Sequence, residues 1–74
     1  MDVFQERLRA CRKKMNKSQE EAAAEMELSY RSYRRYESGE SEPTLTPLVR
    51  LADYFGVSLD YLTGRSDDDS PFAK

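Results

Sequence analysis

Apolar residues recur at helical spacing along the first part of the chain. Phe4, Leu8, Cys11 and Met15 are three or four positions apart, which places them on one face of a helix rather than on a strand. Asn16 follows this stripe, and asparagine tolerates the left-handed conformation in which helices end. The pattern predicts a first helix that buries all four apolar side chains.

Two short helices are expected next, joined by a very short turn. Ser18, with Glu21 three residues later, fits the capping box that begins a helix, and the alanine-rich stretch that follows is strongly helix-forming. These alanines either let a neighbouring helix approach closely or simply reflect helix propensity. A third helix over 29–38 has Ser29 as its cap and Gly39 as its stop. So short a turn requires the two helices to cross at a steep angle.

Two more helices complete the pattern. Helical spacing of apolar residues predicts a fourth helix that ends at Gly56, and either Thr44 or Thr46 suits its start. The apolar positions of this helix are Leu45, Leu48, Leu51, Ala52 and Phe55. A last short helix begins at Ser58 and stops at Gly64. No segment alternates convincingly with period two, so the sequence predicts an all-α fold of five helices.

Composition limits what so short a chain can do. The 74 residues are 38% hydrophobic and 35% charged, which suits one small domain, expected over 1–65, with an acidic flexible tail over 66–74. Cys11 is the only cysteine and there is no histidine, so we expect no disulfide, no zinc site and no cofactor. No apolar run is long enough to span a membrane, no small-molecule ligand is evident, and a cytoplasmic location is expected.

Charge is distributed unevenly. Residues 1–39 hold nine Lys/Arg and seven acids, whereas residues 40–74 hold three Lys/Arg and seven acids, so the net charge of −2 hides a basic first half. A nucleic-acid contact is therefore expected in the first half.

The predicted third helix has two different sides. Wound at about 100° per residue, it places Ser29, Tyr33 and Tyr36 on one side. The opposite side carries Tyr30, Arg31, Arg34, Arg35 and Ser38. Arginine suits DNA because its guanidinium group can donate two hydrogen bonds to the O6 and N7 acceptors of guanine and also binds phosphates. The alternative is an ordinary solvated cationic face, paired with the acids of the second helix.

Several stretches together resemble one family. They are Ser18-Gln19-Glu20-Glu21-Ala22-Ala23, Leu28-Ser29, Arg35-Tyr36-Glu37-Ser38-Gly39, Pro43 and the run from Leu51 to Gly64. In combination they resemble the phage-repressor, Cro-like (XRE) helix-turn-helix family over roughly residues 4–65. The resemblance implies a five-helix, lambda-repressor-like domain that binds double-stranded DNA as a homodimer. It also implies a repressor of transcription that recognises a palindromic operator through helix 29–38.

The resemblance also assigns roles to individual residues. The positions expected to reach base edges are Tyr30, Arg31, Arg34 and Arg35. The positions expected to contact phosphate are Ser18, Gln19, Ser29 and Ser38. Arg12 and Glu37 match a pair that the family often uses as an internal salt bridge.

The chain departs from the family pattern at three places. Glu27 replaces the usual glycine of the turn, so the turn must form without glycine's freedom or with mild strain. Lys17 stands where an apolar residue is common, and its stem is expected to pack while its amine stays in water. Glu40 and Glu42 stand where relatives often have cations, and two carboxylates near phosphate weaken DNA binding.

Two other classes of function compete with a DNA-binding regulator. An enzyme is disfavoured because the chain has no histidine base, no glycine-rich phosphate loop and only one cysteine, on an apolar stripe. A protein-interaction module of the same fold, binding an antirepressor or a toxin, is the stronger rival, since tyrosine and arginine are common interface anchors. The candidates for a homodimer contact are the last helix, Tyr54, Tyr61 and the tail around Phe72.

Overall fold

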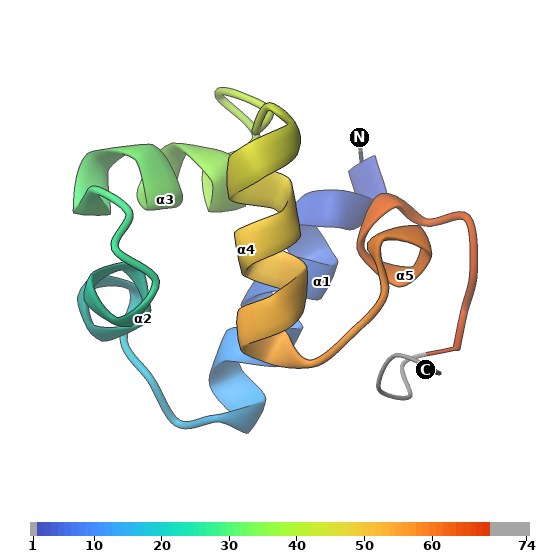
Figure 1. The fold of residues 1–74 in the computed structure, drawn as a ribbon, viewed down its shortest axis with the longest axis horizontal. Coiled ribbons are helices and arrows are strands. Elements are labelled where there is room, and N and C mark those ends of the chain that lie inside the picture. Colours follow the sequence, from blue (N-terminus) through green and yellow to red (C-terminus); the bar gives the residue numbers. More distant parts are fainter. Residues whose placement is uncertain (1, 69–74) are drawn as a thin grey trace.

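A computed structural model describes residues 2–68, which form five helices and no strand (Figure 1). The helices are α1 (Asp2–Lys14), α2 (Gln19–Glu25), α3 (Tyr30–Ser38), α4 (Leu45–Phe55) and α5 (Leu59–Thr63). The predicted all-α fold of five helices is confirmed. None of these helices is long and apolar enough to cross a membrane.

Serine caps begin three of the five helices. The Ser18 hydroxyl accepts the backbone N–H of Glu21 at 3.0 Å, and the Glu21 carboxylate accepts the backbone N–H of Ser18 at 2.9 Å, which completes the expected capping box. Ser29 and Ser58 cap α3 and α5 in the same way, at 3.0 and 2.9 Å. These predicted helix starts are confirmed. For α4 the structure decides between the two threonines, because Thr44 is the N-cap.

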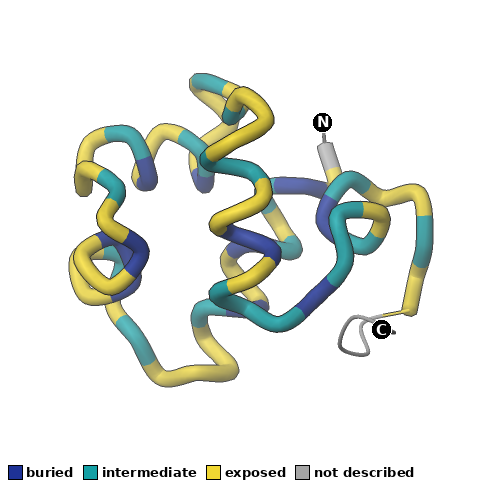
Figure 2. Tube along the Cα trace, viewed as in Figure 1, coloured by how far each residue is buried: buried dark blue, intermediate teal, exposed yellow. Residues whose placement is uncertain are grey.

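The core lies where these helices meet. α1 packs against α3 and α5, α2 packs against α3, and α4 packs against α5. The largest fully buried side chains are Tyr33, Phe4, Leu8, Leu51 and Leu62. Figure 2 shows the buried segments turned toward the middle of the molecule. Along the longest axis, α2 and α3 lie at one end and α5 lies at the other (Figure 1), so the third helix is at an edge of the fold.

Gly39 allows α3 to end close against α1. Its backbone is left-handed, with φ of 84°, and a Cβ atom there would clash with the side-chain amide of Gln5. The left-handed conformation therefore favours glycine at this position, whereas a movement of the flexible Gln5 side chain would relieve the clash.

Some apolar positions were assigned wrongly. Met15 is 38% exposed because α1 already ends at Lys14 and the backbone turns at Asn16, where φ is 57°. Leu45 is 69% exposed because it is the first residue of α4 and extends beyond the packed part of the helix. Tyr36, by contrast, packs against the core on the predicted side of α3, although it is only half-buried. A periodic pattern gives the buried face of a helix, but it does not give the point at which packing stops.

Arg7 holds the chain just beyond α5. Its guanidinium donates to the backbone oxygens of Tyr61 and Ser66 at 2.6 and 2.5 Å and to the Asp67 carboxylate at 2.8 Å. It also lies over the Tyr61 ring, 4.2 Å from the ring centroid. The first residues of the predicted tail are thus bound to α1, whereas Phe72 lies outside the described residues.

Candidate nucleic-acid interface

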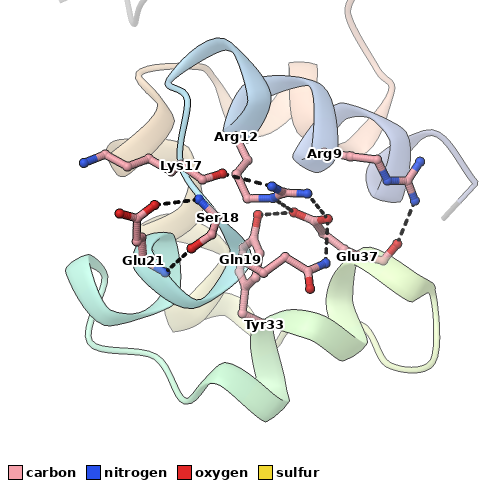
Figure 3. Close-up of polar contacts among 8 residues, drawn as sticks. All are labelled: Arg9, Arg12, Lys17, Ser18, Gln19, Glu21, Tyr33 and Glu37. Carbon is pink, nitrogen blue, oxygen red and sulfur yellow. Dashed lines mark hydrogen bonds and ion pairs between the residues drawn. The ribbon is translucent and has the colours of Figure 1, made fainter.

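The inner side of α3 is fixed by a buried carboxylate. Glu37 is only 2% exposed. Its oxygens accept two hydrogen bonds from Arg12, at 2.7 and 3.1 Å, one from the Gln19 amide at 3.0 Å and one from the Tyr33 hydroxyl (Figure 3). The carboxylate therefore has partners from α1, α2 and its own helix. The Arg12–Glu37 pair that the family resemblance implied is present in the structure.

These contacts shift the titration of the group. Burial alone would raise the pKa of Glu37, but the hydrogen bonds from Arg12, Tyr33 and Gln19 outweigh burial and hold its pKa below the ordinary value. Burial and the neighbouring carboxylate raise the pKa of the Tyr33 hydroxyl. Glu37 is therefore charged and Tyr33 is neutral near pH 7.

Further bonds from α1 fix the ends of α2 and α3. Arg12 also donates to the backbone oxygen of Lys17 at 2.9 Å, just before α2 begins. Arg9 donates to the backbone oxygen of Glu37 at 3.3 Å, at the C-terminal end of α3, where a cation also compensates the helix dipole. Figure 3 shows both arginines reaching from α1 toward the other two helices. The orientation of α3 is thus set by polar contacts as well as by packing.

The outer side of α3 is exposed and basic. Arg31, Arg34 and Arg35 are all exposed, and the Tyr30 side chain is 43% exposed. Within residues 2–68, the guanidinium groups of Arg31 and Arg35 have no hydrogen-bond or ion-pair partner, whereas Arg34 lies 5.6 Å from the centroid of the Tyr30 ring. Two of the three acids of α2 bind elsewhere, since Glu21 caps α2 and Glu25 pairs with Lys17. The cationic side of α3 is therefore open to a partner.

The serines expected at phosphate already have partners in the protein. The hydroxyl oxygens of Ser18 and Ser29 accept backbone N–H groups of their own helices, which leaves each O–H free to donate. The Ser38 hydroxyl lies 3.1 Å from both the Arg35 backbone oxygen and the Glu40 carboxylate. Glu40 therefore competes for the hydrogen that Ser38 would donate to a phosphate.

The turn between α2 and α3 is made without glycine. Of the two alternatives, the structure has the turn with mild strain, because Glu27 adopts a left-handed conformation with φ of 59°. Arg50 of α4 lies 3.4 Å from the backbone oxygens of both Met26 and Glu27 and supports the turn. Sequence reasoning missed Arg50, because no local signal connects it to a turn more than twenty positions earlier.

Lys17 keeps its amine at an exposed site, as expected, where it also has a protein partner. Its ammonium group pairs with the Glu25 carboxylate at 2.8 Å, and the second oxygen of that carboxylate accepts the Tyr54 hydroxyl at 2.5 Å. Glu25 lies on α2 and Tyr54 lies on α4. These contacts therefore connect the segment just before α2, and α2 itself, to α4.

A family model described as helix-turn-helix matches residues 8–62. The chain belongs to the helix-turn-helix family. It is 48% identical over 62 residues to the cryptic phage CTXphi transcriptional repressor RstR of Vibrio cholerae, a match that covers 84% of this chain and 55% of the relative.

Other relatives are regulators from Bacillus subtilis. The SPbeta prophage-derived uncharacterized HTH-type transcriptional regulator YonR is 38% identical over 60 residues, covering 81% of this chain and 56% of the relative. The uncharacterized HTH-type transcriptional regulator YobD is 36% identical over 69 residues, covering 93% of this chain and 62% of the relative. The chain thus spans little more than half the length of these relatives. No solved structure matches it significantly.

Proposed function

We propose that this chain is a DNA-binding transcriptional regulator that represses from a palindromic operator and inserts α3 into the major groove. The observation that carries this proposal is the opposition of the two sides of α3. Glu37 binds the helix to α1 and α2 on one side, and exposed arginines cover the other. The names of the relatives, which are transcriptional regulators and a repressor, support the same function.

The exposed side chains suit two kinds of DNA contact. The arginines and the tyrosine, which are Tyr30, Arg31, Arg34 and Arg35, would reach base edges in the groove. The side chains expected at the flanking phosphates are Ser18, Gln19, Ser29 and Ser38. Gln19 suits a double role, because one N–H of its amide donates to Glu37 and the second remains for a phosphate oxygen.

A homodimer on DNA follows from the small size of one recognition surface. α3 has only nine residues, so one copy reads few base pairs. Two copies related by two-fold symmetry would read half-sites about 34 Å apart, which doubles the contacts and requires a palindromic operator.

One observation favours a protein partner instead of DNA. Glu40 binds Ser38 at the end of α3, and Glu42 is exposed nearby, so carboxylates flank the arginines. This face of arginines and carboxylates would suit a protein surface that carries charges of both signs.

Titration of the protein with duplex DNA at several salt concentrations tests the proposal. Duplexes are first selected from a random pool, and binding is then measured by fluorescence anisotropy, with a scrambled duplex as the control. A DNA reader should lose affinity steeply with salt, with a slope in log–log form of about −0.9 for each phosphate contacted. Failure to bind any duplex near 50 mM salt would refute DNA binding and favour the protein partner.

A further inference from the structure

Tyr30 and Arg34 form a pair of contacting side chains on the exposed side of α3. They are one helical turn apart, and the Arg34 guanidinium carbon lies 5.6 Å from the centroid of the Tyr30 ring. We propose that Tyr30 and Arg34 together read a guanine next to a thymine. This inference rests on the proposed function and adds the base step that the interface recognises.

Arg34 differs from Arg31 and Arg35 because its guanidinium already has a partner in the protein, the Tyr30 ring. Arg31 and Arg35 have no partner within residues 2–68, so binding must fix all their rotatable bonds at an entropic cost. The Tyr30 ring attracts the Arg34 guanidinium through its π face and restricts it before DNA arrives. Less rotamer freedom is lost when a restricted side chain binds, so Arg34 is best suited to a contact that demands fixed geometry.

Reading a base edge is such a contact. The guanidinium fork donates two hydrogen bonds to N7 and O6 of guanine, and both must align at once. A phosphate oxygen accepts from a wide range of directions, so it does not need a restricted arginine. Arg34 is therefore assigned to guanine.

The exposed ring of Tyr30 determines the neighbouring base. It is 43% exposed although it is aromatic, and its ring atoms beside Arg34 would enter the groove with the guanidinium. The C5-methyl group of thymine is the apolar group that an unmodified base pair presents in the major groove. Because Tyr30 is held against Arg34, the thymine it contacts must adjoin the guanine.

Modified bases test the assignment of Arg34 to guanine and of Tyr30 to thymine without altering the protein. In a duplex selected from a random pool, the thymine beside each guanine is replaced with uracil, which removes only the methyl group. In a second duplex that guanine becomes 7-deazaguanine, which removes only the N7 acceptor. Wild-type protein should lose about fourfold in affinity on loss of the methyl group and about tenfold on loss of N7.

Protein variants connect each effect to its side chain. Tyr30→Ala should no longer distinguish thymine from uracil, whereas Tyr30→Phe should retain the distinction because the ring remains. Arg34→Ala should no longer distinguish guanine from 7-deazaguanine, because alanine has no group that donates to N7. Arg65→Ala is the matched control, since Arg65 is exposed near α5, at the other end of the fold.

The possible outcomes separate this inference from the proposed function. If wild-type protein binds selected DNA with a steep salt dependence but tolerates both base changes, or if the selected duplexes lack guanine beside thymine, the base assignment is wrong and DNA binding stands. If no duplex is bound at low salt, the proposed function fails and the base assignment fails with it.

Discussion

The side-chain amide of Gln19 donates to Glu37 across 3.0 Å and so joins the first residue of α2 to the last turn of α3. Arg12 of α1 binds the same carboxylate. One buried acid thus connects the three helices that position the exposed arginines. The direction in which α3 faces the solvent depends on this contact as well as on apolar packing.

Removing the charge of Glu37 should destabilise the fold. Glu37→Gln preserves the size of the side chain but leaves the Arg12 guanidinium, which is only 13% exposed, without its anionic partner. We expect the free energy of unfolding to fall by about 3 kcal/mol, as for other buried pairs that lose one member. Urea denaturation followed by circular dichroism measures the loss. Glu40→Gln, an identical change at an exposed site, should alter stability by no more than about 0.5 kcal/mol, and equal losses in both variants would contradict this role for Glu37.

Lowering the pH should remove the stabilisation that the charge of Glu37 provides. The pKa of Glu37 is lower in the folded protein than its ordinary value of 4.5, so its stabilising effect is complete above that pH and is lost as the pH falls through the folded pKa. The stability difference between wild type and Glu37→Gln should therefore be constant near neutrality and shrink as the pH falls below 4.5. Denaturation curves at pH 7, 5, 4 and 3 test this. A difference that does not change with pH would mean that the Glu37 charge is not what stabilises the wild type.

The turn before α3 should accept glycine. Glu27 has φ of 59°, a region that costs a residue with a Cβ atom roughly 1 kcal/mol. Glycine removes this strain in the folded protein, but its greater freedom in the unfolded chain offsets part of the gain. Glu27→Gly should therefore raise the free energy of unfolding by about 0.5 kcal/mol. Asn16→Gly is the comparison, because asparagine tolerates the same conformation and should gain less. Destabilisation by Glu27→Gly would show that the Glu27 side chain contributes a stabilising contact.

Glu40 should weaken DNA binding in the wild type. Its carboxylate repels phosphate and accepts the hydroxyl of Ser38 at 3.1 Å. Glu40→Gln removes the charge, and at about 0.5 kcal/mol for a screened charge the affinity for DNA should rise two- to threefold. Asp60→Asn makes the same change on α5, at the other end of the molecule (Figure 1), and should raise it much less. Anisotropy titrations of the two variants decide the question, and equal increases would indicate that only net charge matters.

Local chemistry explains why so much of the fold was predictable. Ser18, Ser29 and Ser58 each cap the helix that follows them, and these caps act within three residues. The exposed position of the arginines on α3 also followed from helical periodicity, because Tyr33 is fully buried and sets which side faces inward. Signals of this kind depend on neighbours along the chain and are readable in one sequence.

Long-range contacts explain what the sequence did not reveal. Arg7 reaches Ser66 and Arg50 reaches the turn at Glu27, but neither arginine stands out from its neighbours in the sequence. The exposure of Leu45 depends on where its packing partners end, which the helical pattern does not encode. The Glu40–Ser38 contact likewise depends on the path of a loop.

The most direct test of the account compares arginines on opposite ends of the molecule. Arg31 and Arg35 are exposed on α3, and Arg65 is exposed near α5. In Arg31→Ala and in Arg35→Ala, binding to a selected duplex should become less favourable by about 1–3 kcal/mol where the side chain reads a base. The melting temperature of each variant protein should be unchanged. Arg65→Ala should bind nearly as wild type. If all three variants bind the duplex as wild type does, the exposed side of α3 is not the DNA-binding surface.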